Sequence, residues 1–290
     1  MTQAGILLAL GCALLANVAL LCKHRGAMVA PDVQFSHPLR SAAALFASRW
    51  WTIGFVIATL AWGLHVAAMS IAPLSLVQAV IAGGLALLAI PARHMFGIKL
   101  GWRELAGLGL SASGLAFLAL TATEQGPAGS SQYSLETMAA FEGIAIALGA
   151  ALLLSGHRGQ GHRRGELMLA IAAGVLIGVS NVAIKALAEV VPGDVLAIVS
   201  PWTLVALVAA IGSFFALARS LQLGDPVEVI VISSVAANCA AIMGGVLVFG
   251  DPVGSDALAV AARSAAFAAV IAAAALIPAT PGARARSQHA

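Results

Sequence analysis

The chain has 290 residues, of which 61% are hydrophobic and 9% are charged. A soluble globular domain is about 45–50% apolar and about 25% charged, so the composition excludes a soluble protein and makes lipid the main solvent. The formal net charge of +3 is carried by short loops, which favours anionic lipid headgroups over nucleic acid as partners. We therefore expect an all-α polytopic membrane protein.

A membrane span needs about 20 predominantly apolar residues. On that measure nine spans are predicted: 4–22, 50–71, 74–92, 104–123, 137–155, 167–188, 195–217, 227–249 and 256–278. The apolar run from 51 to 92 is too long for one crossing, so Pro73 is expected to mark a turn. The first span is followed by its basic residues, Lys23 and Arg25. It should therefore stay uncleaved and insert with the N-terminus outside.

Basic residues occupy every second gap between these spans. The gaps with Lys or Arg are Lys23 to Arg49, Arg93 to Arg103, Arg158 to Arg164, the turn at Arg219, and the tail with Arg284 and Arg286. Cytoplasmic loops carry an excess of Lys and Arg, so these gaps and the C-terminus are expected inside. Together with the Ala, Gly and Arg bias, this predicts a multi-pass protein of a bacterial cytoplasmic membrane.

Three short matches, in the same order, link a span to the one five spans later: Asn17-Val18-Ala19 with Asn181-Val182-Ala183, Trp51-Thr52 with Trp202-Thr203, and Pro73 with Pro226. Since five is odd, matched spans cross in opposite directions. The pattern predicts a four-helix repeat at 1–123, a connector helix at 137–155, an inverted repeat at 166–279 and a cytoplasmic tail at 280–290. Inverted repeats are the construction of many secondary transporters.

Helix-start signals precede the eighth span. Gly224-Asp225-Pro226-Val227-Glu228 offers Asp225 as N-cap, Pro226 at the first helical position and Glu228 three residues after the cap. We interpret this pattern as structural.

Polar side chains inside lipid are costly and are candidate functional residues. The predicted substrate path contains Asn17, His65, Gln78, Asn181, Lys185, Asn238 and Arg263, with Glu142 as a possible charge partner. Arg263 in particular is expected to need an acidic partner, from Glu142, Asp194 and Asp256, or an anionic substrate.

Packing is the alternative role for several of these residues. Gly174 and Gly178 share a helix face with Asn181 and Lys185, and a close helix contact there would involve the two glycines. For Asn17 and Asn181, a hydrogen bond to a neighbouring helix and a contact with substrate are equally compatible with the sequence. Lys185 is compatible with snorkelling and an i, i+4 pair with Glu189, and His65 with a packing role.

Enzyme motifs are absent from the sequence. It contains no Gly-x-Ser-x-Gly, His-Glu-x-x-His or Gly-rich phosphate loop, so we expect no enzymatic activity, cofactor or metal site. His157 and His162, beside arginines, indicate a solvated basic loop. Cys12, Cys22 and Cys239 lie inside apolar runs and predict no disulfide framework. The expected partners are the bilayer and a small-molecule or ion substrate, with the chain a monomer or homodimer.

Four segments carry a resemblance that covers nearly the whole chain: Lys23-His24-Arg25-Gly26, Trp50-Trp51, Ala72-Pro73-Leu74-Ser75-Leu76-Val77-Gln78 and Asn181-Val182-Ala183-Ile184-Lys185-Ala186. With the nine-span layout, they resemble the drug/metabolite transporter superfamily, in particular its EamA-like and NIPA-type magnesium-transporter branches. The small multidrug members of the superfamily couple through a Glu in the first span. This chain has no carboxylate there, so coupling by that residue does not carry over.

The resemblance implies a transporter that moves a small solute across the membrane by alternating access. Lys185 and Arg263 favour a neutral or anionic metabolite. The NIPA resemblance implies magnesium or another divalent cation as the alternative, although Mg²⁺ usually binds at least one carboxylate and the predicted core offers little beyond Glu142. A non-transporting scaffold or accessory protein of envelope synthesis is the alternative of another class.

Overall fold

The computed structural model describes residues 2–71, 80–81, 84–94, 101–121, 134–158, 163–190, 199–249, 260–262, 265–266 and 269. All regular structure in these ranges is helical, as the sequence predicts. The chain divides into two compact units. The first consists of Met1–Glu124, Leu221–Val231 and Gly254–Ala290, and the second of Gln125–Ser220 and Ile232–Val253.

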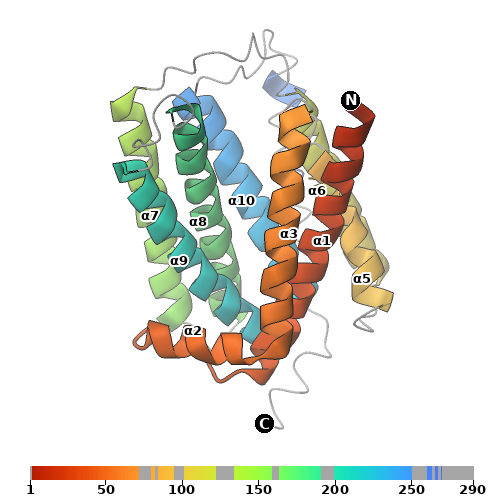
Figure 1. Cartoon of the computed structure of the whole chain (residues 1–290), viewed down its shortest axis with the longest axis vertical. Helices are drawn as coiled ribbons and strands as arrows, with labels where there is room; N and C mark the ends of the chain where they lie inside the picture. The colour runs from red at the N-terminus through yellow and green to blue at the C-terminus, as the bar shows by residue number, and fades with distance from the viewer. Residues whose placement is uncertain are drawn as a thin grey trace. The chain divides into compact units, whose positions relative to one another are not determined.

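The first unit contains α1 (Thr2–Val29), α2 (Pro38–Ala47), α3 (Arg49–Ile71), a 3₁₀ helix η1 (Gly84–Leu88), α5 (Ala89–His94) and α6 (Trp102–Thr121). Helices α1 and α3 lie side by side along their length (Figure 1). Gly54 permits this approach, because a Cβ there would lie 2.7 Å from the carbonyl oxygen of Ala19. The 3₁₀ helix packs against both α1 and α6.

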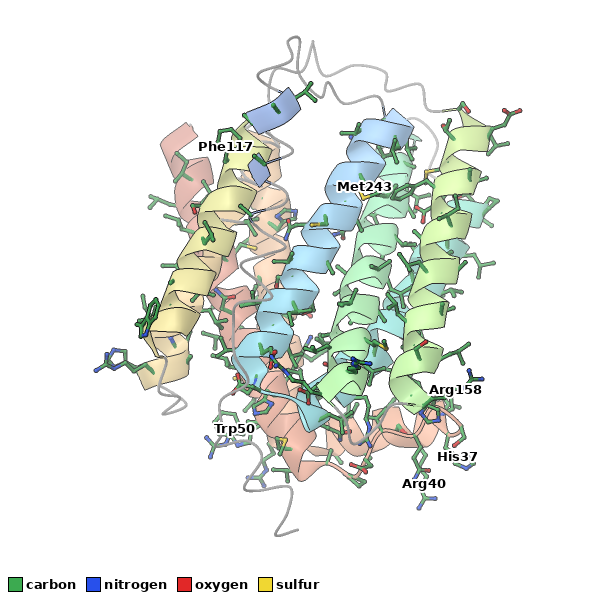
Figure 2. All side chains as sticks on the ribbon, turned by 180° about the vertical axis from the view of Figure 1, so that it is seen from behind. His37, Arg40, Trp50, Phe117, Arg158 and Met243 are labelled. Carbon is green, nitrogen blue, oxygen red and sulfur yellow. The ribbon has the colours of Figure 1, made fainter. Side chains whose placement is uncertain are left out.

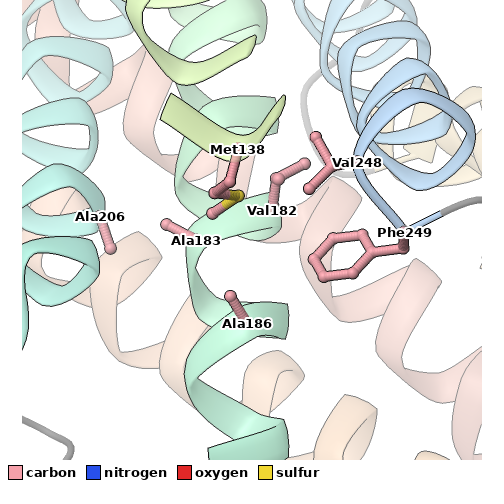
Figure 3. Packing of buried hydrophobic residues seen from close by; sticks show 7 residues of the cluster. All are labelled: Met138, Val182, Ala183, Ala186, Ala206, Val248 and Phe249. Carbon is pink, nitrogen blue, oxygen red and sulfur yellow. The ribbon is translucent and has the colours of Figure 1, made fainter. Parts of the chain in front are cut away.

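The second unit is built from α7 (Leu135–Arg158), α8 (Arg163–Val190), most of α9 (Pro201–Leu223) and most of α10 (Pro226–Phe249). Its buried side chains are mainly small or β-branched. Two hydrophobic clusters form its core, one around Met138, Val182, Ala183, Ala186, Ala206, Val248 and Phe249, and one around Ala145, Val175, Leu176, Val179 and Ala209. Figure 3 shows the first cluster, in which side chains of four helices meet.

Five described helical segments are long and apolar enough to cross a membrane: Ala4–Val29, Leu135–Arg158, Arg163–Leu187, Pro201–Leu223 and Pro226–Phe249. A sixth is counted if the bent pair Pro38–Ala47 and Arg49–His65 forms one span. The predicted third and ninth spans fall partly or largely outside the described residues. In the predicted fourth span, α6 is helical from Trp102 to Thr121, and Leu105–Gly114 within it qualifies as a shorter apolar helix. Nine spans and their orientation remain predictions.

Several helix boundaries differ from those predicted. Helix α1 extends seven residues beyond the expected end at residue 22, so Lys23, His24 and Arg25 are helical. Helix α9 begins at Pro201 rather than residue 195, because proline suits the first helical position. The turn predicted at Arg219 is wrong, since Arg219 is buried within α9 and the turn follows Leu223.

The N-cap predicted for the eighth span is confirmed. Asp225 Oδ1 accepts hydrogen bonds from the backbone N–H groups of Val227, at 2.9 Å, and Glu228, at 3.3 Å. With Pro226 as the first helical residue, the start of α10 is capped as the sequence pattern indicates.

Helix α2 was not predicted, because residues 23–49 were interpreted as a loop. It starts at Pro38, buries Ser41 and Leu45 on one face, and ends where Ser48 adopts an extended conformation. The chain bends there by 93° into α3, and an edge-to-face contact between the rings of Phe46 and Phe55, 5.1 Å apart, joins the two helices. Figure 2 shows Arg40 projecting away from α2 at one end of the first unit.

Candidate functional site

The first polar site lies where α1 meets the 3₁₀ helix η1. Asn17 is buried, with 5% of its surface exposed, and its Nδ2 donates a 3.0 Å hydrogen bond to the carbonyl oxygen of Gly84. One turn earlier on α1, Ala13 lies so close to Gly84 that a Cβ on Gly84 would collide with its methyl group. The start of η1 is therefore held against α1 in two ways. Gly84 has no side chain and so lies close to Ala13, and the Asn17 amide donates a hydrogen bond to its carbonyl oxygen.

Pro91 explains why residues 84–94 form a 3₁₀ helix followed by a short α-helix, rather than one continuous α-helix. A proline inside an α-helix removes one backbone donor, and its ring clashes with the carbonyl four residues earlier. That carbonyl belongs to Leu87, which the structure places in the 3₁₀ helix preceding α5. The resulting break lies within the predicted third span. Sequence reasoning overlooked it, although a proline inside a predicted span was the signal.

His65 and Gln78 are not joined to this site by the described contacts. The His65 side chain is half-buried on α3 and makes no hydrogen bond with any other residue in the described ranges. Gln78 lies outside the described residues. Of the residues predicted for a substrate path in the first unit, Asn17 is the one that the described contacts join to Gly84.

The segment Lys23-His24-Arg25-Gly26 forms a packed junction. Gly26 lies against the backbone of Trp51, where any Cβ would clash. The guanidinium of Arg25 lies over the Trp50 ring, 4.2 Å from its centroid, and His24 Nδ1 lies 2.9 Å from the carbonyl oxygen of Leu221. Two segments quoted for the family resemblance, 23–26 and 50–51, therefore contact each other at the ends of α1 and α3.

Gln222 completes this junction, and no sequence pattern singles it out. Its Oε1 accepts a 3.0 Å bond from the N–H of Val33, and its Nε2 donates to the carbonyl oxygens of Ala27 and Pro31, both at 3.0 Å. One side chain thus satisfies three backbone groups where α1 ends and the following segment begins. We call Gln222 and these three backbone groups the Gln222 clamp.

In the second unit, α8 and α10 are in close contact through glycine. A Cβ on Gly174 would collide with the carbonyl oxygen of Ser233, and one on Gly178 would collide with the methyl group of Ala240. The packing role considered for the two glycines is therefore confirmed. Asn181, one turn further on, is exposed and makes no hydrogen bond with the described residues.

The paired asparagines thus have different surroundings. Asn17 is buried and donates a hydrogen bond to a backbone carbonyl, whereas the Asn181 side chain is exposed. A hydrogen bond from Asn181 to a neighbouring helix, one of its two expected roles, is not formed with the described helices.

Lys185 and Asn238 are each engaged within this unit. The Lys185 Nζ lies over the ring of Phe249, 4.1 Å from its centroid, which is a cation–π contact between α8 and α10. Asn238 Nδ2 donates a 2.8 Å hydrogen bond to the carbonyl of Ser234, four residues earlier in α10. The partner predicted for Lys185, Glu189, has no described side chain.

Glu142 is the most isolated acid in the described part of the chain. Its side chain is 2% exposed, and neither carboxylate oxygen has a hydrogen-bond partner among the described residues. It lies on the buried face of α7 that also carries Met138, Ala145 and Gly149. Its predicted partner Arg263 lies outside the described residues, so their pairing stays a prediction.

Within the described ranges no three His, Cys, Asp or Glu side chains gather as a metal-binding group. Comparisons with protein-family models, with curated proteins and with solved structures found no match.

Proposed function

We propose that this protein is a secondary transporter of the drug/metabolite transporter type, which moves a small neutral or anionic solute across the cytoplasmic membrane by alternating access. The observation that carries the proposal is the bond from the buried Asn17 amide to Gly84, at the start of a 3₁₀ break. In secondary transporters, discontinuous helices in the membrane expose backbone groups that bind substrate. A buried amide beside such a break is costly in lipid and is expected where it serves a site.

The division into two compact units of helices supports the same proposal, since alternating access uses two bodies that move against each other. Divalent-cation transport and a scaffold role remain the competing hypotheses. The first predicts uptake of Mg²⁺ and the second predicts no flux of any solute.

The test is a transport screen with purified protein in liposomes, with and without a pH gradient, over neutral metabolites, organic anions and Mg²⁺. We expect flux of a neutral or anionic compound, abolished by Asn17→Ala. The matched control is Thr59→Val, because Thr59 lies outside the predicted substrate path and its hydroxyl bonds only its own helix among the described contacts. Flux of Mg²⁺ alone would favour the cation transporter, and no flux of any compound would contradict transport.

A further inference from the structure

Glu142 has properties that packing and solubility do not explain. It is a carboxyl group on a membrane-length helix, it is almost fully buried, and both its oxygens lack a hydrogen-bond partner in the described part of the chain. An ionised carboxylate in such a place costs far more than a neutral carboxylic acid, because no group in the described ranges offsets its lost hydration. A residue with this cost is expected to have a function.

The described side chains around Glu142 belong mainly to two hydrophobic clusters. On its own helix, Met138 and Ala145 lie one turn to either side, and each belongs to a hydrophobic cluster. Further side chains of α7, α8, α9 and α10 complete these clusters. They are mostly aliphatic, with aromatic rings from Phe141 on α7, Trp202 on α9 and Phe249 on α10. Neither carboxylate oxygen therefore has a described donor within hydrogen-bond reach that would stabilise a negative charge.

Few titratable groups lie on these elements. Helix α8 from Leu167 to Leu187 carries only Lys185, whose ammonium lies over the Phe249 ring, and α10 from Val229 to Phe249 carries only Cys239. Helix α9 from Pro201 to Leu217 carries none. On α7 itself, Glu136 is exposed near the start of the helix, and His157 and Arg158 lie at its far end.

We propose that Glu142 is a proton-binding site that couples the transporter to the proton gradient. The inference rests on the proposed function for its role in transport. In the packed state, one carboxylate oxygen holds a proton taken from water, and the neutral acid is tolerated among apolar side chains. When α7 and α8 separate enough to admit water, the O–H bond breaks and the proton returns to solvent. No electron is transferred and no other bond changes.

The packing of α7 on α8 indicates from which end of α7 water would reach Glu142. Gly149, about two turns beyond Glu142, faces Leu176 so closely that a Cβ would lie 2.7 Å from its Cδ2. Glu142 lies about two turns from the start of α7 at Leu135. Water therefore has a shorter path to the carboxyl from that end, which the predicted topology places outside the cell.

The proton site can be tested without a known substrate, in purified full-length protein. The packed state binds one proton more than a state in which the carboxylate meets water, so raising the pH favours the second state. We expect the thermal midpoint to fall with rising pH in the wild-type protein and in Glu136→Gln. The dependence should be much weaker in Glu142→Gln, whose neutral amide keeps the shape of the protonated acid. An equal fall in wild type and Glu142→Gln would overturn the proposal.

Infrared spectroscopy of the wild-type protein keeps the test decisive if Glu142→Gln fails to fold. A protonated-carboxyl band should persist at neutral pH, and its absence would overturn the proposal. Both measurements read proton binding alone. A chain that binds this proton but moves no solute would contradict the proposed function and leave the proton site standing. A chain that transports with the same pH dependence in Glu142→Gln would contradict the coupling.

Discussion

At the scale of single residues, the contacts between helices depend on side chains that are small or absent. Gly174, Gly178 and Gly244 lie where a Cβ would meet atoms of another helix, whereas Gly63, Gly109 and Gly143 have open space there. In lipid, helices associate through close packing because the surrounding chains are as apolar as the helices themselves. The first three glycines are therefore stability determinants.

Replacing Gly174 with Ala should destabilise the second unit. The added methyl group meets the backbone carbonyl of Ser233, which cannot move without shifting α10, and overpacking of this kind costs about 1–3 kcal/mol. Thermal unfolding in detergent measures the effect. Gly143→Ala, on α7 of the same unit, is the matched control and should leave the midpoint unchanged or raised. Equal midpoints for the two variants would contradict the described contact between α8 and α10.

The Asn17 amide should contribute to stability where the Asn238 amide does not. Asn17→Ala removes a bond between α1 and the 3₁₀ helix, and interhelical hydrogen bonds in membrane proteins contribute about 0.6–2 kcal/mol. Asn238→Ala removes a bond to the preceding turn of its own helix, so its effect should be smaller. Denaturation in mixed detergent micelles compares the two variants. A larger loss for Asn238→Ala would show that the Asn17 bond is not structural.

At the scale of elements, the sequence predicts apolar helices well and their ends poorly. Apolar length gives α7, α8 and α10 to within a few residues. It fails at the end of α1, because Lys23 and Arg25 continue the helix while their charges lie over the Phe55 and Trp50 rings. Such contacts join residues about 25–32 positions apart, and hydropathy, which is a local sum, does not contain them.

Helix α2 was missed for a related reason. Its buried Ser41 and Leu45 make only a narrow stripe, and Leu39 and Phe46 are exposed beside it. A ten-residue helix with so short a pattern is marginal by itself and depends on its contacts with α3 and the preceding segment.

The Gln222 clamp should control the segment that follows α1. Val33 is buried, and its N–H donates a hydrogen bond to Gln222 Oε1. Gln222→Ala removes this acceptor, so exchange of the Val33 amide with solvent should accelerate markedly. Hydrogen–deuterium exchange of a peptide covering 30–37 measures this. Thr59→Val is the control, because the Thr59 hydroxyl bonds only the preceding turn of α3 and its loss should leave the 30–37 peptide unchanged. Unchanged exchange in Gln222→Ala would contradict the clamp.

At the scale of the whole molecule, orientation is the prediction that the sequence makes most directly. Reporter fusions after Gly129 and Gly193 should report outside, and fusions after Gly159 and at the C-terminus should report inside, because Lys and Arg mark the cytoplasmic loops. A cytoplasmic signal after Gly129 would overturn the assignment of every span.

The sequence indicates which polar residues lie inside apolar helices, but not what they contact. Among the described residues, the sequence indicates Asn17, Lys185 and Asn238, because each is a polar side chain inside an apolar run. It does not indicate their partners, a carbonyl at Gly84, the Phe249 ring and the carbonyl of Ser234, because backbone acceptors and distant aromatic rings leave no mark beside the residue. The superposition of the two predicted repeats stays a prediction.

In the segment Gly84–Leu88, a change between 3₁₀-helical and α-helical conformation would alter both the length of the segment and its rotation about the helix axis. Its five residues span about 10 Å, against about 7.5 Å in an α-helix, and each residue turns by about 120° instead of about 100°. Asn17 holds the carbonyl at the start of the segment, so a change between the two forms would be transmitted to α5. Helix α5 would then shift by about 2.5 Å along the helix axis and rotate about that axis by about 100°. Neither movement would occur without the other.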